Sequence, residues 1–196
     1  AESLPSEYNR SPIEMKLSTL RCMLLDTSSN MQYTSFMSQL QFEIKQTKGF
    51  TSTAEEALLN LQRTADHIHI AFTRLFREHG ITAQQYNVLR ILRGAGEPLP
   101  ILEVGERMVT VVPAITGLID RLEKQGLVRR TRSEADRRVV TVTILGKGLK
   151  LLSDLDKPIV QLNEQLLDHM EEKELKQAIT LLEKLRSHCP SCQDKP

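Results

Sequence analysis

Five arginines lie within ten consecutive residues of this 196-residue chain, and an aspartate stands among them. The cluster consists of Arg129, Arg130, Arg132, Asp136, Arg137 and Arg138. Guanidinium groups bind phosphate oxygens through paired hydrogen bonds, and a neighbouring carboxylate can fix the direction of one of them. A segment that only faced solvent would not need so many guanidinium groups. The cluster therefore predicts a surface that binds a polyanion such as a nucleic-acid backbone.

The charge of the chain is distributed unevenly along its length. The formal net charge is only +1, which says nothing about nucleic acid. Residues 110–150 nevertheless hold nine Lys and Arg against four acidic residues, whereas residues 151–196 hold six basic and nine acidic residues. The positive excess coincides with the arginine cluster, which favours phosphate contact at that place.

Two helical patterns precede the arginine cluster. The first covers residues 100–108, and its expected inward residues are Leu102, Val104 and Met108. The second starts with Pro113 at the first helical position, where a missing N–H costs nothing. Its apolar face follows the spacing i, i+3, i+4 and i+7, with Ile115, Leu118, Ile119 and Leu122. The second helix thus has one side committed to a core and another side free.

A hairpin pattern completes the unit. Two β-rich runs, 127–131 and 139–144, are joined by the basic tip. Two helices followed by a cationic hairpin are typical of a winged helix-turn-helix, in which one helix enters the major groove of DNA. An ordinary amphipathic helix covering a core would explain the second helix alone, but it would not explain the basic hairpin.

The motifs of this segment resemble the MarR family of transcriptional regulators. The matching positions are Glu103, Glu106, Arg107 and Met108, then 120–128 with Arg130, then Asp136, Arg137 and Arg138, and finally Gly146. The resemblance implies a recognition helix that reads the major groove of a pseudo-palindromic site. It also implies that Arg138 or Arg137, held by Asp136, reaches the minor groove. The residues expected to contact DNA are Thr110, Val111, Val112, Pro113, Ala114, Thr116, Gly117, Arg121, Arg132, Asp136, Arg137 and Arg138.

Three residues depart from what relatives often carry in the recognition helix. Val111, Val112 and Gly117 stand where polar or basic side chains are common, so bidentate reading of guanine is excluded at these positions. Base reading would then depend on Thr116, on apolar contact of Ala114 or Val112 with thymine methyl groups, and on DNA shape. We predict weaker or less discriminating binding than in relatives with an arginine there.

Long helices are expected on both sides of the winged unit. The first starts near Thr53 and ends before Gly80, and a helix capped by Thr82 and Gln85 follows it. After the hairpin, residues 149–170 are helical but contain Pro158, which should kink or divide that helix. The first and last helices carry more apolar surface than one small winged domain can cover, which indicates mutual burial in a two-fold dimer.

The expected fold is mostly α with a small β-wing: a winged helix-turn-helix domain plus N- and C-terminal helices that form a dimerisation lobe. The expected parts are an N-terminal extension at 1–50, a dimerisation helix at 51–80, the DNA-binding domain at 81–146, C-terminal dimerisation helices at 147–188 and a tail at 189–196. The polar, breaker-rich start predicts a loosely held segment. The methionine at position 37 suggests that residues 1–36 are an added leader or the product of an upstream start.

Candidate sensing residues lie outside the winged unit. Phe72, Arg74 and Tyr86 could line an effector pocket for a small aromatic or anionic molecule, although core and solvent-facing roles are the simpler alternatives. His67 and His69 are two residues apart and point to different sides of a helix, which argues against a shared metal. Cys189 and Cys192 have dithiol spacing but supply only two metal ligands, so we expect no metal site and no cofactor.

The leading interpretation is a cytoplasmic homodimeric DNA-binding regulator, most simply a repressor, that a small molecule releases from DNA. Three cysteines in a chain of this length favour a reducing compartment. No run of eighteen apolar residues is present. The alternative interpretation keeps the fold and makes oxidation of Cys189 and Cys192 the signal. An enzyme is disfavoured because no nucleophile elbow, phosphate loop or HExxH motif occurs.

Overall fold

The computed structural model describes residues 38–132 and 139–189. The chain divides into two units, residues 1–51 and 52–196. The described part of the first unit contains a short helix, α2 (Gln39–Glu43), with a capping box at its start. There the Ser38 hydroxyl accepts from the Gln41 backbone N–H, while the Gln41 side chain accepts from the Ser38 backbone N–H.

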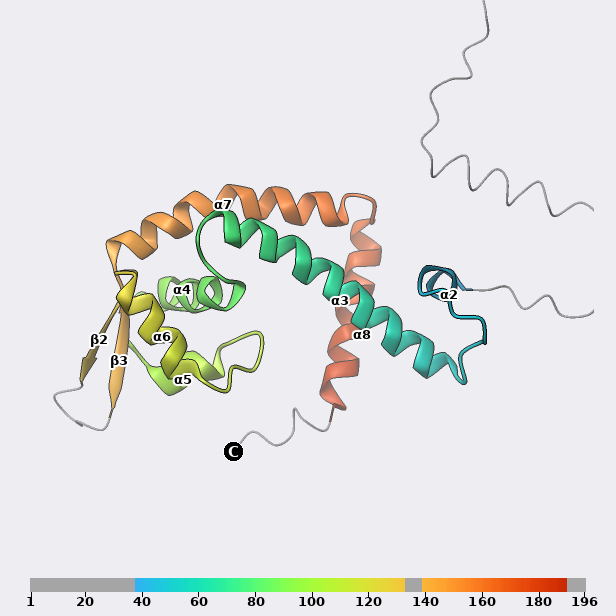
Figure 1. Ribbon diagram of the computed structural model, residues 1–196, viewed down its shortest axis with the longest axis horizontal. Coiled ribbons are helices and arrows are strands. Elements are labelled where there is room, and N and C mark those ends of the chain that lie inside the picture. The colour runs from blue at the N-terminus through green and yellow to red at the C-terminus, as the bar shows by residue number, and fades with distance from the viewer. Residues whose placement is uncertain (1–37, 133–138, 190–196) are drawn as a thin grey trace, which may run out of the picture. The chain divides into compact units, whose positions relative to one another are not determined.

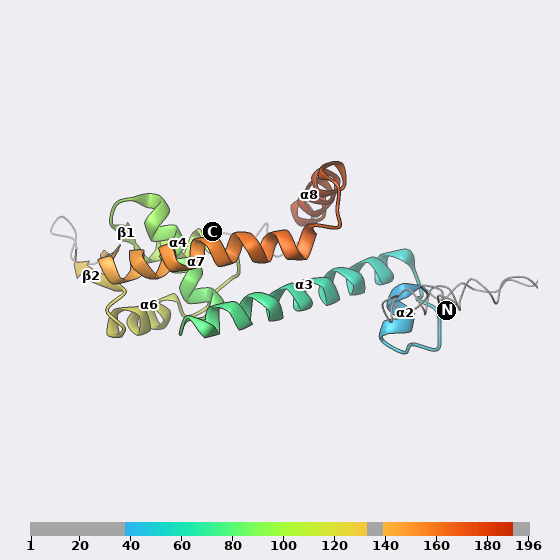
Figure 2. The same cartoon turned by 90° about the horizontal axis from the view of Figure 1, so that it is seen from above.

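The second unit is mostly helical and carries one small antiparallel sheet, which confirms the expected fold class (Figure 1). Its described elements are α3 (Thr53–Glu78), α4 (Ala83–Ala95), β1 (Leu99–Pro100), α5 (Ile101–Glu106), α6 (Ile115–Lys124), β2 (Val128–Arg132), β3 (Val140–Ile144), α7 (Gly146–Leu167) and α8 (Glu172–Ser187). In Figures 1 and 2 the carboxyl-terminal end of α3 lies beside α7, and the two helices diverge from there; α4 to α6 lie with the sheet near the end where they meet.

Local sequence signals account for the ends of the first two long helices. The Ser52 hydroxyl accepts from the Glu55 backbone N–H and starts α3. Thr82 and Gln85 form the predicted capping box of α4. Gly80 follows α3 and Gly96 ends α4, both with φ near +70°, a conformation that glycine adopts without strain.

The sheet has the order β1-β3-β2, and all its pairs are antiparallel. β2 and β3 form the predicted hairpin, with Val128 opposite Ile144 and Arg132 opposite Val140. Leu99 of β1 pairs with Val142 and adds a third strand that the sequence pattern did not predict. Two residues are too few to give an alternating pattern.

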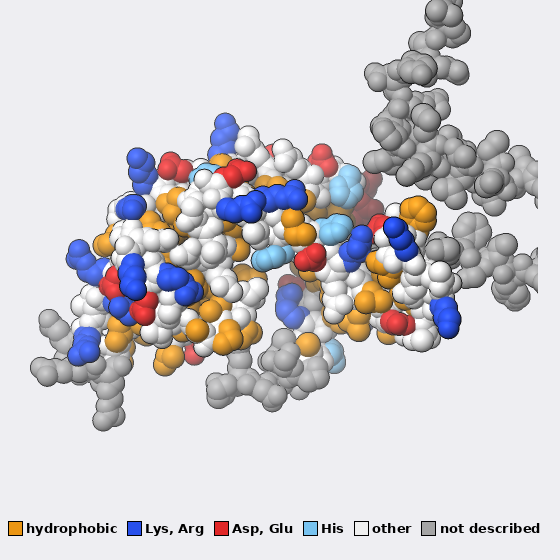
Figure 3. Space-filling model, in the orientation of Figure 1, with side chains coloured by type: hydrophobic (Ala, Val, Ile, Leu, Met, Phe, Trp, Pro, Cys, Tyr) orange, Lys and Arg blue, Asp and Glu red, His pale blue; other side chains and the backbone are white. Residues whose placement is uncertain are grey.

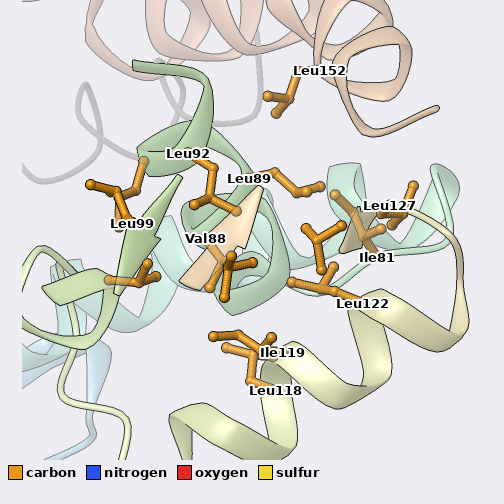
Figure 4. Packing of buried hydrophobic residues seen from close by; sticks show 14 of the residues in the cluster. Ile81, Val88, Leu89, Leu92, Leu99, Leu118, Ile119, Leu122, Leu127 and Leu152 are labelled. Carbon is orange, nitrogen blue, oxygen red and sulfur yellow. The ribbon is translucent and has the colours of Figure 1, made fainter. Parts of the chain in front are cut away.

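The hydrophobic core surrounds α4 (Figure 4). Its fully buried members come from α4, α5, α6, the sheet and α7: Val88, Leu89, Leu92, Val104, Leu118, Ile119, Leu122, Val128, Val142, Leu152 and Leu155. The inward face predicted for α6 is confirmed, since Leu118, Ile119 and Leu122 are buried and Ile115 packs against the cluster. The core therefore holds α6 by one side only.

Two predictions about the helix-turn-helix were wrong. Pro113 is not the first helical residue, because Ala114 has a non-helical backbone (φ −123°, ψ 56°) and α6 begins at Ile115. Pro113 and Ala114 form a turn before the helix, and Val112 just ahead of them packs against the core. Leu102 is not inward but 77% exposed. Ile101, Val104 and Met108 occupy the core side of α5 and the turn instead.

Pro158 does not divide the helix that contains it. α7 runs without interruption from Gly146 to Leu167. Leu155 is fully buried and Ile159 packs against the same core. Apolar contacts on both sides of the proline thus keep this segment helical, although the proline ring removes one backbone hydrogen bond.

The flanking helices leave much apolar surface in solvent. Phe76 is the one residue of α3 that is buried, and α8 has no buried residue. The large exposed apolar side chains of α3, α7 and α8 are Leu58, Ile68, Ile70, Leu149, Val160, Leu167, Ile179, Leu181, Leu182 and Leu185. Within the described ranges, no helix has the length and apolar character needed to cross a membrane.

Candidate nucleic-acid interface

The amino end of α6 and the turn before it present an open surface. Thr110, Val111, Pro113, Ala114 and Thr116 are exposed. No side chain caps the start of α6, so its first backbone N–H groups are not taken by a capping hydroxyl or carboxylate. Free N–H groups at a helix start attract anions, including the phosphates of a nucleic acid.

Two other predicted contact residues are less open. Val112 is half-buried because it packs against the hydrophobic core. Gly117 is partly buried, yet a Cβ built on it would meet no other atom within 4 Å. Val112 is therefore poorly placed for an apolar contact with a ligand, whereas Val111, at 89% exposure, is open.

Arg130 ties the hairpin to α6. Its backbone N–H donates to Glu123 Oε1 at 2.8 Å, and its Nε donates to Glu123 Oε2 at 2.7 Å. Its Nη1 also pairs with Asp120. These hydrogen bonds, first from the Arg130 backbone and then from its side chain, lower the pKa of Glu123. Two acidic side chains of α6 thus hold one arginine of β2.

This clamp was not predicted, although its three residues belong to the motif that suggested the fold. The sequence spacing placed Asp120, Glu123 and Arg130 close in the chain order, but only the hairpin geometry brings β2 alongside α6. Arg130 is consequently occupied by carboxylates, and its guanidinium is the least available of the described wing arginines for a phosphate.

The carboxyl end of α6 is held by two further helices. Lys147 of α7 donates from Nζ to the Gln125 carbonyl oxygen at 2.8 Å. Gln85 of α4 donates from Nε2 to Gln125 Oε1 at 3.2 Å. Helix α6 is therefore held at its carboxyl end and open at its amino end.

Gly148 lies where α7 packs closely against the hairpin. A Cβ at this position would lie 2.6 Å from the Leu127 carbonyl oxygen and 2.9 Å from Ile144 Cγ1. The Leu145 backbone N–H donates to the same carbonyl at 2.9 Å. Gly146, which the sequence comparison matched to the family pattern, has open space around it. The glycine that permits close packing of α7 on the hairpin is therefore Gly148.

Basic side chains gather beside α6 and β2 (Figure 3). Arg121 on α6 and Arg129 and Arg132 on β2 are exposed. Asp136, Arg137 and Arg138, expected to reach the minor groove, lie outside the described residues. The geometry brings together an open helix start, an exposed second-turn arginine and the described arginines of the hairpin.

Comparison with known proteins decides the family. A MarR family profile matches residues 81–140. A MarR transcription factor from Planctomyces limnophilus has a solved structure that is 43% identical, with a TM-score of 0.55, and the match covers 69% of this chain and 98% of that one. The chain belongs to the MarR family. It is a DNA-binding transcriptional regulator, as its relatives are, and not an enzyme.

Two other similar proteins have names that state an activity or a ligand. The transcriptional repressor MdtR of Bacillus subtilis is 29% identical over 127 residues, which cover 65% of this chain and 81% of MdtR. BpsR of Bordetella bronchiseptica, whose DNA binding is regulated by 6-hydroxynicotinic acid, is 24% identical with a TM-score of 0.60. That match covers 67% of this chain and 98% of the BpsR chain, and it shows a shared fold.

The candidate effector residues of this MarR protein lie where α3 meets α4. Phe72 and Tyr86 both stack on Phe76, with ring centroids 5.9 and 4.6 Å from it. Burial raises the pKa of Tyr86. Arg74 is exposed. Two surface pockets flank the end of α3, and both are lined by other residues, which include His79, Lys147 and Lys150 in one and His69, Thr73 and Arg77 in the other.

The candidate redox and metal residues stay untested. Cys189 is exposed, while Cys192 lies outside the described residues. Within 38–132 and 139–189, no group of three or more His, Cys, Asp or Glu side chains is arranged to hold a metal ion. The cysteine alternative therefore remains a prediction from sequence.

Proposed function

We propose that this MarR protein acts in the cytoplasm as a homodimeric repressor that binds a pseudo-palindromic operator. The observation that carries the proposal is the one-sided burial of α6: its inner face is packed and its amino end is open beside a basic hairpin. Such a helix fits the major groove, and the hairpin then follows the backbone or the minor groove. The name of MdtR supports repression rather than activation.

The exposed apolar faces of α3, α7 and α8 support the dimer. Leu182 and Leu185 of α8 and Val160 of α7 are each more than 40% exposed. Monomeric proteins rarely leave so many large apolar side chains in solvent on neighbouring helices. A two-fold dimer would cover them and present two recognition helices to two half-sites.

The proposed contacts divide into base-reading and backbone-positioning residues. Val111, Ala114 and Thr116 face the bases, with Thr110, Pro113 and Gly117 alongside and Val112 behind them. Arg121 and Arg132 hold phosphates. Arg138 or Arg137, oriented by Asp136, enters the minor groove, as the family resemblance implies.

Release from DNA is proposed to follow from a small aromatic or anionic effector bound near Phe72, Arg74 and Tyr86. BpsR, which responds to 6-hydroxynicotinic acid, supports this class of ligand. An effector acts only through a difference in its affinity for the DNA-bound and free arrangements of the dimer. The stacked rings join α3 of the dimerisation lobe to α4 of the winged domain. A ligand bound there would therefore contact both helices.

Selection of bound duplexes from a random DNA pool tests the proposed function. We expect enrichment of one pseudo-palindromic sequence whose complex contains two protein chains, and weaker binding when 6-hydroxynicotinic acid or a similar aromatic acid is added. Recovery of no sequence above background would refute operator binding. An enriched sequence without internal symmetry, bound by one chain, would refute the dimer.

A further inference from the structure

Val111 is the most exposed of the large apolar side chains in the described part of the chain, at 89%, and Val109 follows at 81%. Both lie in the turn between α5 and α6. Single exposed valines on a protein surface are ordinary and need no explanation. Val111 differs because it lies four residues before the first residue of α6, where a helix-turn-helix comes closest to the base edges.

The side chains of the turn before α6 and of its first residues can form few hydrogen bonds. From Val109 to Gly117 the side chains offer two hydroxyls, those of Thr110 and Thr116, and no amide, carboxylate or cation. Pro113 lacks a backbone N–H as well. Paired hydrogen bonds to guanine need Arg or Lys, and those to adenine need Asn or Gln. The stretch can therefore read neither purine in that way.

Thymine is the base that offers this surface a matching group. Its 5-methyl projects into the major groove, where it is the apolar feature that distinguishes a T·A pair. Val111 presents two methyl groups that make little contact with the rest of the described chain. Gly117 has no side chain, and no other atom lies within 4 Å of the position that a Cβ would occupy there. A base edge can therefore approach the backbone of the first turn of α6 closely.

We propose that Val111 reads DNA sequence by packing against the 5-methyl group of a thymine in each half-site. The operator then contains a T·A pair at the position facing the start of α6. This inference rests on the proposed function, because it names the base chemistry that the proposed DNA interface prefers.

Replacing single thymines by deoxyuridine tests the inference, since it removes the methyl group and leaves the base pair intact. The probe is a duplex selected from the random pool, and affinity is measured by fluorescence anisotropy. Burial of one methyl-sized group corresponds to about a fourfold change in affinity. We expect one thymine per half-site to show this loss, and about a fifteenfold loss when both half-sites are substituted.

Variants assign the effect to Val111. In Val111→Ser the ratio of thymine to deoxyuridine affinity at that position should fall to about one, and in Val111→Ile it should persist. Leu102→Ser, which changes an exposed leucine of α5, should leave the ratio unchanged. Since Val111 is exposed, these substitutions leave the core intact.

The outcomes separate the inference from the proposed function. Tight binding of a selected duplex with no deoxyuridine-sensitive position overturns the thymine proposal and leaves operator binding in place. A sensitive position that stays equally sensitive in Val111→Ser overturns the assignment to Val111. Failure to bind any duplex overturns the proposed function itself, and the thymine inference with it.

Discussion

Arg130 is the residue whose contacts place the hairpin relative to α6. Glu123 accepts from both its backbone N–H and its Nε, and Asp120 pairs with its guanidinium. These groups are about one-third exposed, so the ion pairs themselves add little stability. Their effect is geometric, because two carboxylates of α6 hold the middle residue of β2 against that helix.

We expect Glu123→Gln to reduce the pH dependence of folding stability. Since hydrogen bonds lower the folded pKa of Glu123, its contribution is complete above the unfolded pKa of about 4.3 and is lost as the pH falls through the folded pKa. Urea unfolding at about pH 6 and about pH 3 measures the difference. Glu97→Gln, in the loop before β1, should keep the wild-type difference. Equal pH dependence in wild type and Glu123→Gln would rule out the clamp.

Gly148→Ala should destabilise the protein by about 1–3 kcal/mol. The added Cβ would lie 2.6 Å from the Leu127 carbonyl oxygen, which is backbone and cannot rotate away. Gly146→Ala is the matched control, because the same atom there meets nothing within 4 Å. Denaturant midpoints of the two variants provide the comparison. If Gly148→Ala were as stable as Gly146→Ala, the close approach of α7 to the hairpin would be disproved.

At the scale of elements, local signals predicted more than long-range ones did. The starts of α3 and α4 follow from capping side chains, and the hairpin follows from two β-rich runs around a polar tip. The errors came where tertiary packing decides. β1 exists only because β3 lies beside it, and Leu102 is exposed because Ile101 takes the core side of α5.

The candidate site was predicted in the same uneven way. The sequence identified the helix, its inward face and the basic hairpin, since these are local patterns. It did not reveal that Arg130 is clamped by Glu123, that Val112 is half-buried or that Gly148 rather than Gly146 allows close packing. Each of these depends on a contact between elements that are separate in the chain.

The helices outside the winged domain should form the dimer interface. Leu182→Lys would place a charge in the apolar face of α8, and we expect it to shift the protein from dimer to monomer in sedimentation equilibrium. Leu102→Lys is the control, since this exposed leucine lies on α5 within the helix-turn-helix. A dimer that survives Leu182→Lys, or one that Leu102→Lys dissociates, would place the interface elsewhere.

For the whole molecule, the distribution of charge matters more than its sum. A net charge of +1 gives no general attraction to DNA, yet residues 110–150 carry an excess of five positive charges. Attraction to phosphate is therefore directed to the winged domain, whereas the segment after residue 150 has more acidic than basic residues. Binding should depend steeply on salt because a dimer brings two such surfaces to one duplex.

The salt dependence of DNA affinity tests this account most directly. Anisotropy titrations of a selected duplex from about 50 to 200 mM salt should give a linear fall of log K with log salt, and the affinity should drop by a factor of about 10³ or more if six or more phosphates are contacted. Arg132→Ala, which removes an exposed hairpin cation, should lower the slope by about one for each protomer. An affinity that is independent of salt, or a slope unchanged by Arg132→Ala, would contradict the docking of α6 and its hairpin on DNA.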